Sequence, residues 1–296
     1  LPRTQVTYRL GNHTQMNLGY RRIVEHLGVS NFVIGRRIEN YRSVFVNSGI
    51  HLDQIVSDSY SFGTNYMNSQ KGWYASLNLT YNVKDKSVGT DVSNTTFFSI
   101  RKFQYVETNN LFRGFMYVEK KHQKIPYSLR IQALFQDTEL GAFVDGNQTI
   151  LNTSDLEFDG VLSSVYSSST FNFRLGFRYK QSMSSIDFLP QNVLLETITP
   201  YAEFTGNLYQ DKFNWIFYVK DIYYKSSNIN NEKITDVGFT VRYSFENMGL
   251  FVNSGNLLNI SSTYRRNQVR ADVFMTEESL FYSLPGYINF GVSYSF

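Results

Sequence analysis

Residues 286–296 read Gly286-Tyr-Ile-Asn-Phe-Gly-Val-Ser-Tyr-Ser-Phe296 and carry the clearest structural signal in the chain. Along an extended backbone every second residue points to the same side. One side of this stretch is apolar and holds Ile288, Phe290, Val292, Tyr294 and Phe296. The other side holds Tyr287, Asn289, Gly291, Ser293 and Ser295. The alternation predicts a β-strand with one apolar and one polar face.

The same alternation recurs along the chain, for example in Trp73–Val83, Thr170–Gln181 and Ile234–Phe245. We expect about fourteen strands, most near the ~9–11 residues that a tilted strand needs to cross a bilayer. Short turns alternate with long polar loops, an asymmetry typical of outer-membrane β-barrels. The long loops are expected at Val24–Ser57, Lys84–Asn94, Asp137–Thr153 and Ser182–Thr197. The first of them is expected either to be a loop throughout or to include an irregular strand at Arg42–Val46.

Strands that follow one another are expected to pair as hairpins. Thr4–Leu10 and Thr14–Ile23 meet across a short Gly-Asn turn, which is a strong hairpin signal. Thr95–Val106 is expected to pair with Leu111–Glu119, and Gln268–Phe281 is expected to form one strand beside the last one.

The composition agrees with a membrane barrel. Aromatic residues make up 17% of the 296 residues, and charged residues make up 18%, below the roughly 25% of ordinary globular chains. The mean hydropathy of -0.30 does not separate the two classes, because half of each barrel strand is polar. No run approaches the ~18 apolar residues of a spanning helix. A net charge of +3 gives no reason to expect nucleic acid as a partner.

Two architectures would show this alternation. A soluble protein with two packed sheets has apolar inner faces and polar outer ones. A membrane barrel has the reverse, and it must close because a bilayer core offers no water to unpaired backbone groups. The strand lengths and the many Phe and Tyr favour the barrel, since aromatic side chains sit well at membrane interfaces. We therefore predict an all-β, transmembrane antiparallel β-barrel of the outer-membrane type over residues 1–296.

Several segments resemble the barrel of TonB-dependent receptors. They are Val237–Phe245, the segment Leu250–Asn259 with its Asn256-Leu-Leu-Asn259 motif, and the final strand that ends in Phe. Tyr20-Arg21-Arg22 resembles a motif near the start of such strand pairs. The resemblance implies a Gram-negative outer membrane and uptake of a scarce nutrient, such as a metal chelate, glycan or peptide, with TonB and a plug domain as partners.

The resemblance also bears on completeness. Barrels of this family have 22 strands, so about fourteen would form the C-terminal part of one; the alternative is a smaller barrel built from similar hairpins. Neither a plug domain nor a signal peptide is visible, and the chain begins at Leu1, so we expect a processed or partial chain.

Basic residues gather on the polar side of the cleanest strands. If that side lines a lumen, the candidates are Arg21, Arg130, Arg174, Arg178, Lys180 and Arg242. Few acids are expected to face them beyond Glu203 and Asp236. One interpretation is an interior that attracts an acidic solute or an acidic plug. The other is that these charges solvate the wall or pair across neighbouring strands.

No catalytic, cofactor or metal site is predicted. The four histidines, His13, His26, His51 and His122, lack ligand spacing, and no Gly-x-Ser-x-Gly elbow occurs. His51 near Asp53 and Asp58 is the one cluster to weigh, and we interpret it as ordinary loop polarity.

Three functions stay open at this point: a receptor-like uptake barrel, a structural or secretion-associated barrel that conducts nothing, and a passive porin. Expected partners are outer-membrane lipid, the barrel-assembly machinery, and a plug domain, TonB or a surface lipoprotein. We expect Val292, Tyr294 and Phe296 to form the assembly signal read by that machinery.

Overall fold

The chain folds almost entirely into β-strands. The computed structural model describes residues 2–25, 35–40, 43–47, 54–94, 99–107, 109–122, 126–144, 147–164, 171–187, 192–209, 212–227, 232–259, 264–272, 275–283 and 285–294. Within these ranges the helical structure is one 3-10 turn, η2 (Leu257–Asn259), at the Asn-Leu-Leu-Asn motif. No helix in the described ranges is long and apolar enough to cross a membrane.

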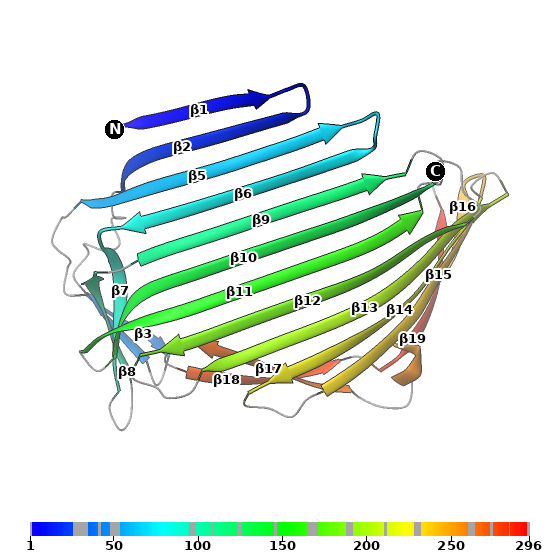
Figure 1. Ribbon diagram of the computed structural model, residues 1–296. Coiled ribbons are helices and arrows are strands. Elements are labelled where there is room, and N and C mark those ends of the chain that lie inside the picture. The colour runs from blue at the N-terminus through cyan, green and yellow to red at the C-terminus, as the bar shows by residue number, and fades with distance from the viewer. Residues whose placement is uncertain are drawn as a thin grey trace.

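A wall of 13 antiparallel strands forms the body of the molecule (Figure 1). The wall strands are β1 (Arg3–Leu10), β2 (Thr14–Glu25), β5 (Ile55–Asn68), β6 (Trp73–Lys84), β9 (Asn109–Lys121), β10 (Tyr127–Val144), β11 (Asn147–Ser164), β12 (Asn172–Ile186), β13 (Val193–Leu208), β14 (Phe213–Ser226), β15 (Glu232–Phe245), β16 (Met248–Gly255) and β19 (Tyr287–Tyr294). Each pairs with the next in this order, and the sheet curves into a trough. The predicted all-β, outer-membrane type of fold is confirmed: about fourteen strands were expected along the chain, and 13 of its strands form the wall.

The two ends of the wall differ. Short turns join β1 to β2, β5 to β6 and β15 to β16 at one end, where the last strand also finishes. Longer connections lie at the opposite end, which we call the loop end, and they contain further strands (Figure 1). These are β3 (Gly35–Asn40), β4 (Ser43–Asn47), β7 (Ser87–Asn94), β8 (Ser99–Val106), β17 (Tyr264–Asp272) and β18 (Met275–Ser283).

Three expectations about these segments are wrong. Residues 99–106 do not pair with the following strand; β8 pairs with β7, and β9 pairs with β6 instead. Lys84–Asn94, expected as a loop, contains the whole of β7. Gln268–Phe281 is a hairpin rather than a single strand. In addition, β4 and β8 pair in parallel, as do β7 and β10, so these inserted hairpins join the end of the wall.

The hairpin of β10 and β11 shows why a loop was expected at Asp137–Thr153. The ladder continues through Thr138 and Thr153 to the pair Val144 and Asn147. Asp137, Glu139 and Asn152 occupy the outward positions of this extension. A ladder that projects beyond a bilayer no longer needs apolar outward residues, so the alternation disappears while the hydrogen bonding persists.

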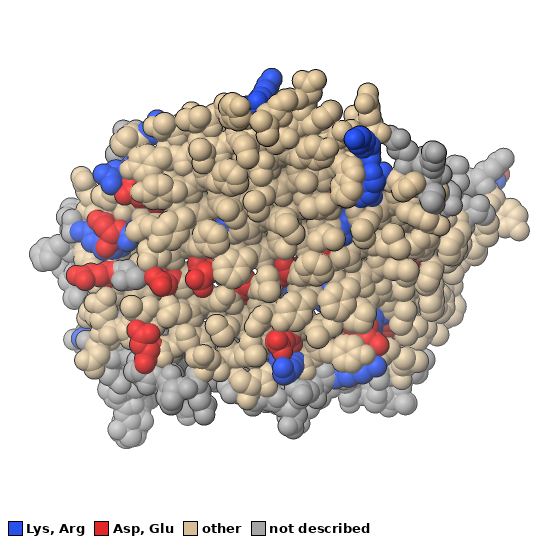
Figure 2. All heavy atoms as spheres, viewed as in Figure 1, with Lys and Arg blue, Asp and Glu red and all other residues tan. Residues whose placement is uncertain are grey.

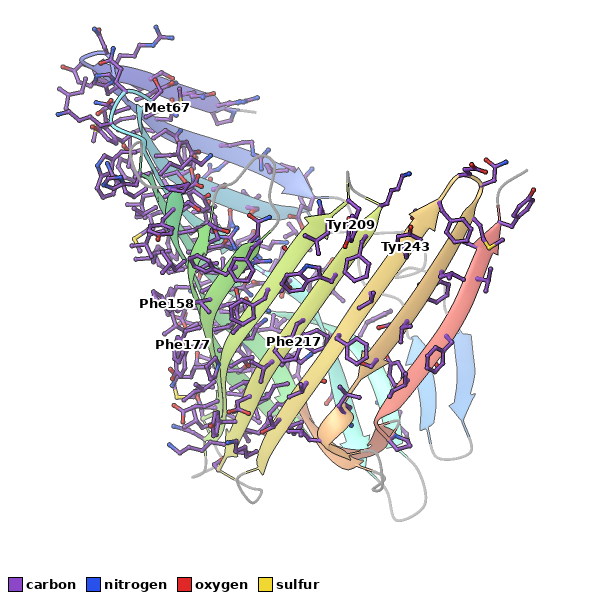
Figure 3. The ribbon with its side chains drawn as sticks, turned by 90° about the vertical axis from the view of Figure 1, so that its right-hand side faces the viewer. Met67, Phe158, Phe177, Tyr209, Phe217 and Tyr243 are labelled. Atoms are coloured by element: carbon purple, nitrogen blue, oxygen red, sulfur yellow. The ribbon has the colours of Figure 1, made fainter. Side chains whose placement is uncertain are left out.

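The apolar side of the wall faces outward, and none of the described residues covers it. Phe158, Phe177 and Phe217 lie on the outer side of the wall in Figure 3. In Figure 2 a broad area across β2 to β9 is free of charged side chains, which gather nearer the loop end. The buried apolar residues of the described part number few: Ile55, Val106, Val161 and Ile186. A soluble two-sheet protein would bury its apolar faces, so this arrangement excludes that alternative.

Aromatic residues border the outward apolar belt on both sides. On β6, Trp73 and Tyr81 lie eight positions apart on the outer face, and on β14, Trp215 and Tyr223 show the same spacing. At about 3.3 Å per residue this is ~26 Å along a strand, or ~20 Å along a membrane normal at a tilt near 40°. Tyr20 and Tyr60 continue the border at the loop end, with ring centroids 5.3 Å apart. The belt therefore has about the height that an outer-membrane hydrocarbon layer requires.

Candidate functional site: the inner face of the wall

Polar side chains line most of the inner face of the wall, with a few apolar ones such as Phe115 and Leu134 among them. Residues opposite each other in a sheet point to the same side, so the pairing register assigns each position to a face. One inner row runs from β2 to β10 through Gly19, Ser61, Thr80, Arg113 and Gln136. The register places all six predicted basic residues on this same face: Arg21, Arg130, Arg174, Arg178, Lys180 and Arg242.

Two of these six form ion pairs across neighbouring strands. Arg178 Nη2 lies 3.3 Å from Asp159 Oδ2, and its Nε lies 3.9 Å from Glu157 Oε1. Lys180 Nζ lies 2.9 Å from Glu157 Oε2. For Arg178 and Lys180, the interpretation of charges paired across strands therefore describes the structure.

The other four basic residues have no such partner. Within the described ranges, no ion pair involves Arg21, Arg130, Arg174 or Arg242. The inner face is nevertheless more acidic than expected, since Glu119, Glu157 and Asp159 join Glu203 and Asp236 on it. Sequence reasoning missed these acids because they stand on strand portions that lack clean alternation.

Two tyrosines shape a recess on the inner face of β13 and β14. Tyr201 leans over Gly176 on β12, where a Cβ would lie 2.5 Å from its Cε1 atom. Tyr218 leans the other way over Gly238 on β15, where a Cβ would lie 2.5 Å from its Cζ atom. A glycine on each flanking strand thus lets a ring lie flat against the sheet. Because the rings lean apart, a recess of about 340 Å³ opens between them.

Cationic side chains predominate at this recess. Its lining includes Arg174, Arg178 and Lys220, with Glu203 as the carboxylate. The Arg174 guanidinium lies 5.9 Å from the ring centre of Tyr201, and Lys220 Nζ lies 2.8 Å from Asp236 Oδ2. Arg174 is thus the lining cation held by an aromatic ring rather than by a carboxylate, among the residues that the structure describes. The recess joins residues of three consecutive strands, β12, β13 and β14.

The hydroxyl group of Tyr201 has an unusual environment. It is buried and has no hydrogen-bond partner among the described residues. Stacking between Gly176 and Arg174, rather than a hydrogen bond at the ring tip, therefore holds the ring in place. Tyr218 differs, because its hydroxyl lies 3.5 Å from Asp236 Oδ1.

The last strand shows the two faces expected from its sequence. Ile288, Phe290, Val292 and Tyr294 pair with Ser254, Val252, Leu250 and Met248 on the outer face. Val292 and Tyr294 are 67% and 58% exposed, so both are open to lipid or to a partner. Phe296, the third member of the expected assembly signal, lies outside the described residues.

No cluster that could hold a metal ion is present in the described ranges. No group of three His, Cys, Asp or Glu side chains there is placed to hold an ion. Of the cluster considered from the sequence, His51 and Asp53 lie outside those ranges, and Asp58 pairs with Arg22 at 2.7 Å. His13 is part of a turn, with Nδ1 3.0 Å from the carbonyl oxygen of Met67.

A curved antiparallel wall with an apolar, aromatic-bordered outside and a polar inside defines an outer-membrane β-barrel fold. No protein-family model matches the sequence, and no curated protein matches it. Among solved structures, the FrpB iron transporter from Neisseria meningitidis (F3-3 variant) is similar, with a TM-score of 0.55 and 9% identity over 90% of this chain and 44% of that one. The likeness shows that this chain shares the fold of part of that transporter.

A second solved structure is also similar. The ferric yersiniabactin uptake receptor FyuA from Yersinia pestis gives a TM-score of 0.49 at 9% identity, over 99% of this chain and 49% of that one. The chain thus spans less than half the length of either protein.

Proposed function

We propose that residues 1–296 are a barrel-wall segment of an uptake receptor in the outer membrane of a Gram-negative bacterium. The observation that carries the proposal is the pairing of an outward apolar belt with a polar inner face, in a fold shared with the FrpB iron transporter. In this proposal Arg21, Arg130, Arg174 and Arg242 face a lumen and favour the entry of an anionic solute. A plug domain and TonB would then gate and energise uptake.

A growth and uptake assay tests this function. The gene for the intact protein is deleted, and accumulation of radiolabelled iron chelates is compared with that of the parent strain, with and without a protonophore. We expect deletion to lower accumulation of at least one chelate, and the protonophore to abolish the difference. Unchanged accumulation of every chelate would contradict the uptake proposal.

Planar-bilayer recording separates the alternatives. A gated receptor should conduct little in bilayers, whereas a passive porin should show steady open-channel current. A barrel that scaffolds a surface or secretion complex would conduct nothing, co-purify with that complex and leave uptake unchanged.

Assembly is a separate part of the proposal. Val292 and Tyr294 present exposed apolar side chains on the last strand, as a strand read by the barrel-assembly machinery must. Truncation of Phe296 should lower the amount of folded protein in the outer membrane several-fold, measured by heat-modifiable migration on gels. Truncation without any such loss would remove Val292, Tyr294 and Phe296 as the signal.

A further inference from the structure

We propose that the recess between Tyr201 and Tyr218 is a binding site for an oxyanion, the carboxylate or phosphate group of a small organic solute. The proposal rests on the function above, because it needs the inner face to line the path of a solute. It goes further by naming one site on that face and the chemistry of its ligand.

The shape of the recess is fixed before any ligand arrives. Gly176 and Gly238 let the two rings lie against flanking strands, so the space between them does not depend on a flexible loop. Both rings stand on paired positions of a continuous ladder, where Tyr201 faces Lys220 and Tyr218 faces Glu203. A volume of about 340 Å³ is at the small end of ligand sites, which suits the anionic part of a small molecule.

The charge of the recess favours an anion. Three lining cations, Arg174, Arg178 and Lys220, outnumber the one lining carboxylate, Glu203. Arg178 and Lys220 already have carboxylate partners outside the recess, at 3.3 Å and 2.8 Å. These pairs hold the two cations in place and reduce the charge that they offer. The main donor for a ligand is consequently Arg174.

The Tyr201 ring orients the Arg174 guanidinium, and no carboxylate of the described residues pairs with it. Its guanidinium lies over the Tyr201 ring at 5.9 Å, which orients the group while leaving its N–H edge able to donate. Guanidinium binds carboxylate and phosphate through two parallel hydrogen bonds. No carboxylate pairs with Arg174 in the described part of the chain, although Glu203 stands opposite it in the ladder. A ligand oxyanion would complete this coordination.

Substituting Glu203 distinguishes an anion-binding recess from one that only supports the packing of the wall. As the carboxylate of the recess, it repels an incoming anion and competes for Arg174. Removing its charge with Glu203→Gln should therefore tighten anion binding, whereas Arg174→Gln should weaken it. Arg113 is a matched control, because it is an exposed arginine on the same inner face that does not line the recess.

The experiment is isothermal titration of the intact purified protein with citrate at low ionic strength, with inorganic phosphate and neutral glycerol titrated in parallel. We expect citrate and phosphate to bind and glycerol not to bind. Arg174→Gln should weaken citrate binding about tenfold or more, the loss of a charge-assisted contact. Glu203→Gln should tighten it several-fold, and Arg113→Gln should leave it unchanged. Heat-modifiable migration on gels verifies that each variant is folded.

Two results would overturn the site. One is citrate binding that Arg174→Gln leaves unaltered in a folded protein. The other is an equal loss in Arg113→Gln, which would indicate general attraction by the inner face. Failure of the proposed function is distinguishable from both, because it would appear as unchanged uptake in the deletion strain while citrate still binds the recess of the purified protein.

Discussion

Replacing Gly176 with alanine tests the packing that shapes the inner face. The added Cβ would lie 2.5 Å from Cε1 of Tyr201, and closer still to Cζ and the hydroxyl oxygen. Nonbonded carbons rest about 3.5–4.0 Å apart, so the ring must move by about 1 Å or more. The move gives up the Arg174 contact, worth ~0.5–1 kcal/mol, and strains the ring rotamer by ~0.5–1.5 kcal/mol. We expect the free energy of unfolding to fall by about 1–2.5 kcal/mol.

The measurement is urea unfolding of the intact protein in lipid vesicles, followed by tryptophan fluorescence. Gly160→Ala is the control, because a Cβ there meets Phe158 at 3.5 Å, an ordinary contact. Its cost should stay within about 0.5 kcal/mol. In a Tyr201→Ala background the ring is absent, so Gly176→Ala should no longer destabilise the protein. Equal costs at Gly176 and Gly160, or a cost that persists without the ring, would refute the reasoning.

Three further substitutions probe the two faces of the wall, using the same unfolding assay. Leu77 stands midway between the aromatic borders of β6, so Leu77→Arg should lower the free energy of unfolding by about 2–4 kcal/mol. Asn78→Arg on the inner face should lower it by under ~1 kcal/mol. Similar losses in the two variants would contradict the assignment of faces. Arg178→Gln leaves the carboxylate of Asp159, which is 12% exposed, without its cation and should cost about 1–2 kcal/mol. Adding Asp159→Asn should recover part of that loss, and no recovery would argue against the pair. Tyr201→Phe removes a buried unpaired hydroxyl, so stability should be unchanged or rise by about 1 kcal/mol; a clear loss would reveal a hidden partner.

The sequence predicted the wall well where lipid imposes a pattern. In Gly286–Phe296, the apolar positions Ile288, Phe290 and Val292 all occupy the outer face of β19. The hairpin of Thr4–Leu10 and Thr14–Ile23 matches β1 and β2 within two residues at each end. Lipid contact requires an apolar side chain at every second position of a strand, so the pattern can be recognised within a single segment.

Which strands pair, and where each strand ends, were harder to predict, because neither follows from the residues of one segment alone. The alternation of Leu111–Glu119 shows a strand but not its partner, and the real partner, β6, lies beyond an inserted hairpin. Strand ends beyond the bilayer were missed for a related reason. Outward positions such as Asp137 and Glu139 have no lipid to satisfy, so the sequence pattern stops before the hydrogen bonds do.

The candidate site was predictable only in part. Arg174 and Arg178 could be assigned to the polar side by counting along one strand. The recess itself depends on Tyr201 leaning over Gly176 and on Tyr218 leaning over Gly238, and each contact joins neighbouring strands. A glycine within a strand signals a close approach, but the approaching ring can be named only once the register is known.

Strand direction adds a counting rule to the wall. The 13 strands alternate in direction, so β1 and β19 both run toward the short-turn end. A seam between β1 and β19 would therefore be parallel, unlike every pair within the wall of the described chain. A second copy in the same membrane orientation would also contribute 13 strands. Its β1 would meet β19 of the first copy, and these two strands would again run parallel. Outer-membrane barrels of a single chain close with an even number of antiparallel strands. A closed antiparallel wall that contains this sheet therefore needs an odd number of strands besides these, and self-association between like-oriented copies does not supply it.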